Sequence, residues 1–394
     1  MKYQDVAIPA GLLWSSPFIR WQGAVGNVTS VDLATAVTNR ALADRGLDPS
    51  VVDEVVLGIT IPQPGYFFGP PTIAGRIGIP QVTGPMVSQA CATGVAALHA
   101  AAASVSTGGG TELVITTDRT SNGPTIVYPS PNAAGGVPAV EDFVQNNFAC
   151  DPWAGTSMLA AAETVARERS ITRGELDDVA VLRYEQYERA LADDRSFQHA
   201  YMVPIELTSG RTHLEATTDA GVRPIDRAAI AGLRPAVADG VHTGASQTHP
   251  ADGTAGAIVT TTARAHELSP GPVARILSTG FARVAPTHMP EAPVPAALRA
   301  LDAAGLTMHQ VDAITTHNPF AVNDIVFARE TGVDLAKMNS YGCSLIWGHP
   351  QAPTGMRAIA ELVTELSLRG GGIGLFTGCA AGDTAAALVV RVDD

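Results

Sequence analysis

Four residues of this 394-residue sequence combine a reactive side chain with a position at the edge of an expected helix or strand. Cys91 follows a short apolar run and precedes the alanine-rich stretch ATGVAALHAAA, which predicts a helix. His317 ends an apolar run ahead of a proline, His349 stands in WGHPQAPTG, and Cys379 stands in LFTGCAAGD. Strand ends beside switch loops are where α/β sheets place their sites. Each residue taken alone is more often structural, because a lone cysteine or histidine usually packs in a core.

Together, the two cysteines and two histidines meet the needs of nucleophilic catalysis combined with proton transfer. We expect Cys91 to lie in the first turn of its helix, where unpaired N–H groups and the helix dipole favour the thiolate. His349 is a candidate base for that nucleophile. Cys379 is a candidate for moving a proton on and off carbon, and His317 for a hydrogen bond to a developing oxyanion. This set fits carbon–carbon bond making or breaking at a thioester.

Composition and charge exclude other classes of function. The formal charge of −13 argues against a nucleic-acid partner, because phosphate binding needs a basic face. The four cysteines form no C-x-x-C pair, so neither a metal site nor a disulfide framework is expected. The chain opens with no signal-like segment and has no apolar run of membrane-spanning length. We therefore expect a cytoplasmic protein without a membrane partner.

The elements that must position these residues occur twice. ALADRGLDPSVVDEVV, from Ala41, and ALDAAGLTMHQVDAIT, from Ala300, share Ala-Leu, Gly-Leu and Val-Asp at the same internal spacing. ATGVAALHAAA, from Ala92, matches PTGMRAIAELV, from Pro353, and GGGTELVITTD matches GGGIGLFTGC. Three matches in the same order indicate two copies of one unit. In each copy apolar strands alternate with helices, which predicts an α/β layered fold with sheets covered on both faces.

A different segment, roughly residues 120 to 243, separates the two copies. It opens with SNGPTIVYPSPNAAGGVP, which we expect to be loop, and continues with the expected helices GTSMLAAAETVARERS and TRGELDDVAVLRYEQYERALADD. Thr172, followed three residues later by Glu175, is a capping-box signature for the second helix. The rest of the segment carries an arginine cluster that suits either an anionic ligand or a solvated surface: Arg211, Arg223, Arg227 and Arg234.

The chain resembles the thiolase family along essentially its whole length. SQACATG looks like the family's acylated-cysteine segment, and GASQTHPADGTAGAIV is similar to its N-A-S-x-x-N-D-G-A-A segment. GHPQAPTG resembles G-H-P-x-G-x-S-G, GCAAGD resembles C-x-G-G-G, and RPIDRAAIAGLRP resembles the R-P…L-R-P pattern. The resemblance implies an α/β thiolase fold of five layers, αβαβα. It implies an N-terminal half of residues 1–119 plus 244–268, a loop domain of residues 120–243 covering the CoA site, and a C-terminal half of residues 269–394.

The resemblance also implies a role for each site residue. Cys91 would be acylated, His349 would activate it, and Cys379 would protonate or deprotonate the α-carbon of acetyl-CoA. The backbone N–H groups of Cys91 and Ala381 would form an oxyanion hole. Coenzyme A would be a substrate, with no permanently bound cofactor, and the implied CoA-binding residues are Ser246, Met158, Arg223 and Arg227. The family implies a homodimer or homotetramer, and some relatives act with an accessory subunit.

Several positions depart from the family pattern. HNPF stands where N-E-A-F is usual, so His317 replaces an asparagine of an oxyanion hole, which resembles the sterol-carrier type and archaeal H-D-x-F thiolases. Met158 stands in Ser-Met-Leu where H-M-G is usual. Glycines of the two catalytic motifs become Ala352, Ala380 and Ala381, and alanine restricts φ. Bulky residues near these segments point to an acyl pocket unlike the acetoacetyl one: Tyr341, Trp347, Phe67, Phe68 and Trp153.

These residues favour a thiolase that cleaves a 3-oxoacyl-CoA with CoA, or runs the reverse Claisen condensation, through an acyl-cysteine. Three alternatives stay open: a condensing synthase of the same superfamily, a thiolase subunit that needs a partner, and a catalytically silent acyl-CoA-binding protein. Cys379 counts against the synthase, which usually has one nucleophilic cysteine. The altered glycines are the support for the silent protein.

Overall fold

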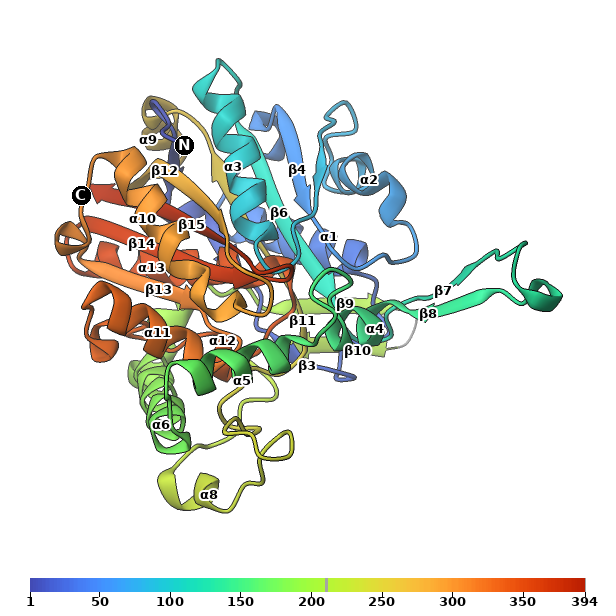
Figure 1. Ribbon diagram of the computed structural model, residues 1–394. Helices are drawn as coiled ribbons and strands as arrows, with labels where there is room; N and C mark the ends of the chain where they lie inside the picture. Colours follow the sequence, from blue (N-terminus) through green and yellow to red (C-terminus); the bar gives the residue numbers. More distant parts are fainter. Residues whose placement is uncertain (210–211, 394) are drawn as a thin grey trace.

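Two β-sheets, each built mainly by one copy of the repeated unit, form the frame of the molecule (Figure 1). The computed structural model describes residues 1–209 and 212–393. One sheet has the strand order β1 (Ala7–Pro9), β12 (Val273–Arg283), β15 (Thr384–Asp393), β14 (Gly372–Ala380) and β13 (Ala313–His317). The other has the order β2 (Leu13–Ser15), β11 (Ala251–Val259), β6 (Glu112–Arg119), β4 (Glu54–Gly58) and β5 (Met86–Val87), with β3 (Ile19–Arg20) also paired to β11.

Helices fill the space between the sheets and cover their outer faces. The central helices α3 (Thr93–Ser106) and α13 (Ala352–Leu368) pack against each other and against both sheets. Outside, α1 (Ser30–Asp44) and α2 (Gly69–Arg76) cover one sheet, and α10 (Pro293–Ala304) covers the other. The predicted five-layer αβαβα order is therefore confirmed, and the two central helices carry the turns that hold the site.

Small residues allow the central helices to approach closely. A Cβ atom on Gly94 of α3 would lie 2.9 Å from the backbone nitrogen of Met356 in α13. A Cβ on Gly355 would lie 3.3 Å from the ring of Phe376 in β14. Such distances leave little room for a larger side chain. The glycines of the two matched helix motifs thus serve the packing of the middle layer.

The repeated strands occupy equivalent places in the two sheets. β4 runs parallel to β6, and β13 runs parallel to β14. Gly46 and Gly305 follow α1 and α10 with φ of 64° and 73°, the left-handed conformation that ends many helices. The start of the chain departs from the expected division into halves, because β1 pairs with β12 in the sheet of the second copy. An edge strand from the first residues therefore ties the two halves together.

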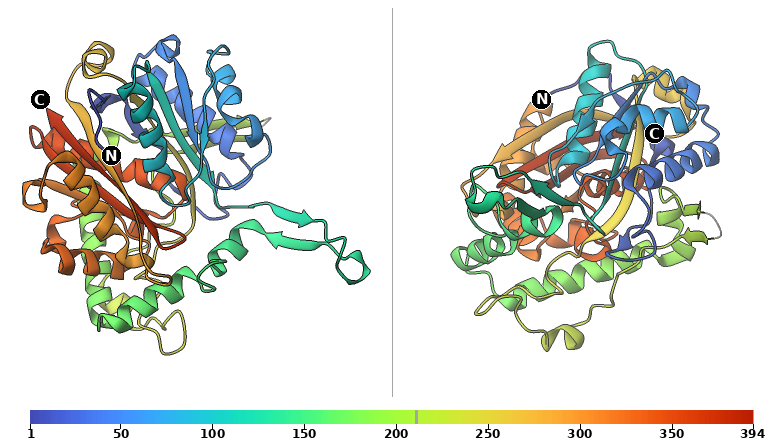
Figure 2. Two further views of the ribbon diagram at one scale, coloured as in Figure 1. Left: turned by 45° about the horizontal axis from the view of Figure 1, so that its top comes forward. Right: turned by 90° about the vertical axis from the view of Figure 1, so that its right-hand side faces the viewer.

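The segment between the copies holds more regular structure than its composition suggested. The expected loop SNGPTIVYPSPNAAGGVP contains β7 (Thr125–Tyr128), which pairs with β8 (Ala139–Asp142), directly after the loop, in a hairpin that projects from the body (Figures 1 and 2). Most of its prolines and glycines, from Pro129 to Pro138, lie between the two strands, so the flanking β-branched residues are free to pair. The predicted helices α5 (Met158–Glu168) and α6 (Arg173–Ala190) follow, and α6 starts with the predicted capping box of Thr172 and Glu175.

The remaining α-helices and strands are four to eleven residues long. They are α4 (Phe143–Ala149), α7 (Ala192–His199), β9 (Ile205–Ser209), β10 (Thr212–Ala216), α8 (Arg227–Ala231), α9 (Thr262–Leu268), α11 (Ala321–Thr331) and α12 (Ser344–Trp347). Within the described residues, none of the helices combines the length and the apolar composition needed to cross a bilayer.

Candidate active site

The four catalytic candidates converge from four separate segments of the chain. Sγ of Cys91 lies 3.2 Å from Nε2 of His349. The imidazoles of His317 and His349 stack with ring centroids 4.2 Å apart, and one nitrogen of each ring lies within 4.8 Å of the Cys91 sulfur. Burial raises the pKa of the Cys379 thiol well above its usual value, and Cys379 is close enough to Cys91 that a negative charge on Cys91 raises this pKa further. The structure thus brings together all four residues that the sequence singled out.

Cys91 stands on a tight turn between β5 and α3, ahead of the helix. The helix begins at Thr93, with Ala92 as its N-cap, and Ala90 has φ 43°, which is uncommon for a residue other than glycine. Thr93 Oγ1 holds the turn, because it accepts a hydrogen bond from the N–H of Gln89 and donates one to the carbonyl of Ala90. The expectation that Cys91 lies in the first helical turn is therefore wrong. The left-handed residue turns the chain so that the sulfur points at the second half of the protein.

Removal from water controls the protonation of the site. It raises the pKa of Cys91 to about 11, even though the backbone N–H groups of Ala381 and of Cys91 face the sulfur. It lowers the pKa of His317 to about 3 and that of His349 well below its usual value, and it raises the pKa of Cys379. The resting site therefore holds two thiols beside two neutral imidazoles. The expectation of a preformed thiolate is wrong, because desolvation outweighs the helix N-terminus.

Two hydroxyl groups orient the imidazoles. Nδ1 of His349 lies 2.6 Å from Oγ1 of Thr354, and a proton on Nδ1 leaves the Nε2 lone pair facing the thiol of Cys91. Nδ1 of His317 lies 2.9 Å from Oγ of Ser344, and a Ser344 hydroxyl that donates to Nδ1 leaves the ring proton on Nε2. Nε2 of His317 is buried and finds no partner in the described part of the chain. One ring is thus suited to accept the thiol proton, and the other is suited to donate to an oxygen of a bound molecule.

A cavity of about 660 Å³ opens onto Cys91 and His349. Met158, the first residue of α5, lines it, as does the turn of Ala381 and Gly382 that follows β14. The remaining wall is largely apolar and includes Phe143, Val144, Phe148, Trp153, Leu159, Met289 and Phe320. His317 and Cys379 are buried outside this lining set. A mostly apolar chamber that ends at a thiol suits an acyl chain carried to a nucleophile.

Comparison with known proteins agrees with this arrangement. The thiolase N-terminal domain matches residues 14–263, and the thiolase C-terminal domain matches residues 271–392. The chain belongs to the thiolase family. It is 29% identical to an acetyl-CoA acetyltransferase of Pseudomonas aeruginosa, over 99% of this chain and all of that protein. It is 30% identical to a 3-ketoacyl-CoA thiolase of Aeromonas salmonicida, over 99% of this chain and 97% of that protein.

Solved thiolase structures share the fold over the full chain. The crystal structure of the Bacillus anthracis acetyl-CoA acetyltransferase superposes with a TM-score of 0.89, at 27% identity over 99% of both chains. Human mitochondrial 3-ketoacyl-CoA thiolase gives the same TM-score at 24% identity over 98% of both chains, which shows the shared fold. The relatives are acyltransferases, and this chain is a thiolase-family acyltransferase.

The alanines that replace thiolase glycines cause no backbone strain. None of Ala352, Ala380 and Ala381 has a positive φ. The turn after β14 instead takes its left-handed residues from Gly382, with φ 80°, and Asp383, with φ 57°. Alanine therefore keeps the N–H directions that glycine would give at these positions. The altered glycines, which were the support for a catalytically silent protein, therefore introduce no left-handed backbone strain.

Of the residues implied to bind the pantetheine arm of CoA, one lines the cavity and the other is buried. Met158 lines the catalytic cavity. Ser246 is fully buried, and its Oγ accepts a hydrogen bond of 2.9 Å from the N–H of Thr243, while its neighbour Gln247 lines the cavity.

The predicted arginines lie on the surface. Arg223 and Arg227 are exposed on the segment at the bottom of Figure 1, where Arg227 begins α8 and pairs with Asp178. Arg211 lies outside the described residues. Arg283, which the sequence analysis did not single out, ends β12 and lines the catalytic cavity.

Three further residues of the site escaped sequence analysis. Asp118 is buried where β6 ends, and it accepts hydrogen bonds from the loop after β4 and, at 2.9 Å, from the N–H of Ala352. A carboxylate that ends the apolar run ELVITTD is the signal that could have found it. Asn323 of α11 donates a 3.2 Å hydrogen bond to Sγ of Cys379, and Gln351 places Oε1 3.3 Å from Sγ of Cys91. Nothing local marks these two, because the tertiary fold alone brings them to sulfur.

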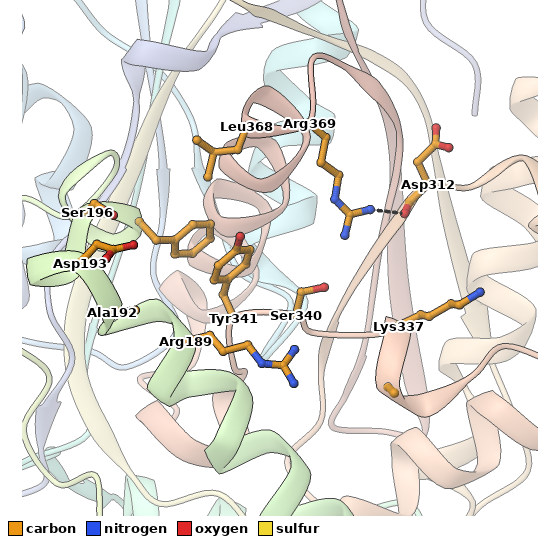
Figure 3. Close-up of a pocket in the computed structure, with 12 residues that line it drawn as sticks. Arg189, Ala192, Asp193, Ser196, Asp312, Lys337, Ser340, Tyr341, Leu368 and Arg369 are labelled. Atoms are coloured by element: carbon orange, nitrogen blue, oxygen red, sulfur yellow. Dashed lines mark hydrogen bonds between the residues drawn. The ribbon is translucent and has the colours of Figure 1, made fainter.

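A larger cavity, of about 840 Å³, lies apart from the catalytic residues (Figure 3). Tyr341 lines it and stacks on Phe197 with ring centroids 3.6 Å apart. Trp347 is buried in the core, whereas Phe67 and Phe68 are exposed on the surface. Of the bulky residues expected near the acyl pocket, Trp153 lines the catalytic cavity. Residues of α4 and α5 contribute part of the apolar wall of this cavity.

Proposed function

We propose that this protein cleaves a 3-oxoacyl-CoA with CoA to give acetyl-CoA and a shortened acyl-CoA, or runs the reverse condensation. The observation that carries the proposal is the position of the Cys91 sulfur. It lies between Nε2 of His349, at 3.2 Å, and the N–H of Ala381, with Cys379 close by. A nucleophile, a base, an oxyanion donor and a second acid at one point are the parts that a thiolase reaction requires.

The first step acylates Cys91. His349 takes the thiol proton as the sulfur attacks the 3-oxo carbon, and the oxyanion binds the N–H groups of Cys91 and Ala381. The bond between carbons 2 and 3 then breaks, which leaves an acyl-cysteine and the enolate of acetyl-CoA. Because Cys91 and His349 are both neutral at rest, the proton moves from sulfur to Nε2 as the sulfur attacks the substrate carbon.

The second step quenches the enolate and releases the acyl group. The Cys379 thiol donates its proton to carbon 2, and Asn323 stabilises the resulting thiolate through its 3.2 Å hydrogen bond. Nε2 of His317, with its proton, hydrogen-bonds the enolate oxygen, which suits its buried and unpaired state. The Cys379 thiolate then takes the proton of the CoA thiol as the CoA sulfur attacks the acyl-cysteine, and His349 returns its proton to the departing Cys91 sulfur, which forms acyl-CoA and restores both thiols. The sum is one 3-oxoacyl-CoA and one CoA converted to two acyl-CoA molecules.

Coenzyme A binding is assigned to Met158 and Ser246 for the pantetheine arm, and to Arg223 and Arg227 for the nucleotide. The lining position of Met158 supports the first assignment, and the exposed guanidinium of Arg223 suits a phosphate. We place the protein in the cytoplasm as a homodimer or homotetramer, with an accessory subunit as the alternative state. A condensing synthase is the second candidate function, and the contact between Cys379 and Asn323 counts against it.

The test is intact-mass spectrometry of the protein incubated with acyl-CoA and 3-oxoacyl-CoA thioesters. The wild type should gain one acyl group and release acetyl-CoA from 3-oxoacyl substrates. Cys91→Ser should lose the adduct, and Cys379→Ala should keep acylation by acyl-CoA while losing acetyl-CoA release by about 10²–10⁴-fold. Cys150→Ser, at an exposed cysteine outside the cavity lining, is the matched control and should behave as the wild type. Acetyl-CoA release that survives in Cys379→Ala would contradict the assigned acid.

A further inference from the structure

Gln351 contacts the nucleophile and takes no part in the steps above. Its Oε1 lies 3.3 Å from Sγ of Cys91, and only 5% of the residue is exposed. It stands directly before α13 with φ 67° and ψ −106°, a conformation that residues other than glycine rarely adopt. A buried polar side chain that a strained backbone holds against the reacting atom is more often functional than incidental.

Half of the Gln351 amide has no protein partner. Its Nε2 makes no hydrogen bond with the part of the chain that the structure describes, and the residue lines the catalytic cavity. Most of the surrounding wall is apolar, including Phe143 of α4 and Met158 of α5. An unpaired amide in such a wall favours a bound molecule that supplies the missing hydrogen bond over one that offers only hydrocarbon.

The geometry of an acyl-cysteine decides which part of the substrate meets this amide. The acyl carbonyl carbon is one bond from the sulfur, and in the proposed mechanism its oxygen binds the N–H groups of Cys91 and Ala381, which face that sulfur. The next two carbons of the acyl group lie two and three bonds from the sulfur. An amide that already touches the sulfur is therefore within reach of a substituent on these carbons.

We propose that Gln351 selects acyl groups that carry a hydroxyl on the second or third carbon, an inference that rests on the proposed thiolase function. A hydroxyl both donates and accepts, so it pairs with either end of the amide. The matching cleavage substrate is a 3-oxoacyl-CoA with a hydroxyl on carbon 4 or 5, which becomes carbon 2 or 3 of the acyl-cysteine. Gln351 is thus a specificity-determining residue.

The experiment compares two thioesters that differ by one hydroxyl, 3-hydroxybutyryl-CoA and butyryl-CoA. The rate of Cys91 acylation is followed by CoA release and by intact mass in the wild type, Gln351→Met, Gln351→Leu and Gln247→Met. The wild type should react about tenfold faster with the hydroxylated thioester. Both Gln351 variants should lose this preference to within about twofold, because an apolar side chain offers no partner. Gln247→Met is the matched control and should keep it, since the Gln247 amide already donates to the carbonyl of Thr243.

The outcomes separate this inference from the proposed function. Equal rates for the two thioesters in the wild type overturn the inference and leave Cys91 acylation, and hence the proposed function, in place. A preference that persists in both Gln351 variants overturns it as well, because another group then reads the hydroxyl. An equal slowing with both thioesters in the Gln351 variants assigns Gln351 to holding the sulfur and also overturns selection. Acylation by neither thioester in the wild type overturns the proposed function itself.

Discussion

Each copy of the repeated unit places a turn at the end of a strand against the start of the other copy's central helix. The turn of the first copy contacts the backbone there, whereas the turn of the second copy contacts the sulfur of Cys91. In the first copy β6 ends near Asp118, whose carboxylate accepts the N–H of Ala352 where α13 begins. In the second copy β14 ends at Ala380, and the N–H of Ala381 faces the sulfur of Cys91 just ahead of α3. Each strand end therefore contacts the start of the other copy's central helix.

The two turns differ in whether their polar groups already have hydrogen-bond partners within the protein. Asp118 accepts four hydrogen bonds, two to each oxygen, from Thr60, Ile61 and Ala352. Its partners are complete without a ligand, so this turn fixes the start of α13. The turn after β14 instead directs the N–H of Ala381 at a sulfur that is neutral at rest, so this donor acts fully only when negative charge develops. Equivalent turns thus form a fully hydrogen-bonded contact between Asp118 and Ala352 in the first copy, and a contact between Ala381 and the nucleophile candidate Cys91 in the second.

The pH dependence of Cys91 reactivity should show the largest effect. Because removal from water raises the pKa of Cys91 to about 11, the thiolate fraction should rise with pH across the whole range below that value. The rate of alkylation by iodoacetamide should therefore increase about tenfold per pH unit between about pH 7 and 9.5. Mass spectrometry in a Cys150→Ser background measures it, since Cys150 is exposed. A rate that levels off below about pH 8 would mean that the N–H groups prevail over desolvation.

Asp118→Asn should break the hydrogen-bonded contact between the first copy's turn and the start of α13. Both oxygens of Asp118 accept from donors, so either orientation of an asparagine amide places an NH₂ against an N–H or O–H group. We expect a loss of about 1–3 kcal/mol in the free energy of unfolding, measured by urea denaturation. Thr60→Val removes one of these donors and should cost less. An unchanged urea midpoint in Asp118→Asn would show that this turn does not fix the start of α13.

Ala381→Gly tests the turn of the second copy and should have the smallest effect of the three changes. Because Ala381 lacks a positive φ, restoring glycine should leave kcat/KM for 3-oxoacyl-CoA cleavage within about threefold of the wild type. Gly382→Ala is the informative partner, since φ 80° at that position strains any alanine, and it should reduce kcat/KM more. If Ala381→Gly raised kcat/KM tenfold or more, the alanine would be impairing the oxyanion hole.

Sequence analysis predicted the architecture well because the chain repeats. Collinear matches from Ala41, Ala92 and Gly108 indicated two α/β units, and the layered fold with strands β4, β6, β13 and β14 follows them. It failed at the projecting hairpin, where the proline and glycine of the tip hid the pairing of Val127 with Val140. Local composition reports turns reliably but does not report which flanking strands meet.

The amino-acid sequence by itself determined the family and the doubled fold, and it singled out Cys91, His317, His349 and Cys379 as catalytic candidates, because these depend on motifs and on their order. Only the tertiary structure decided the protonation of the site, since desolvation depends on what the rest of the chain packs around each group. It also decided the contacts of Gln351 with Cys91 and of Asp118 with Ala352, which join halves of the chain distant in sequence. A hydrogen bond between distant segments exists only once the sheets and central helices have packed, so no local pattern announces it.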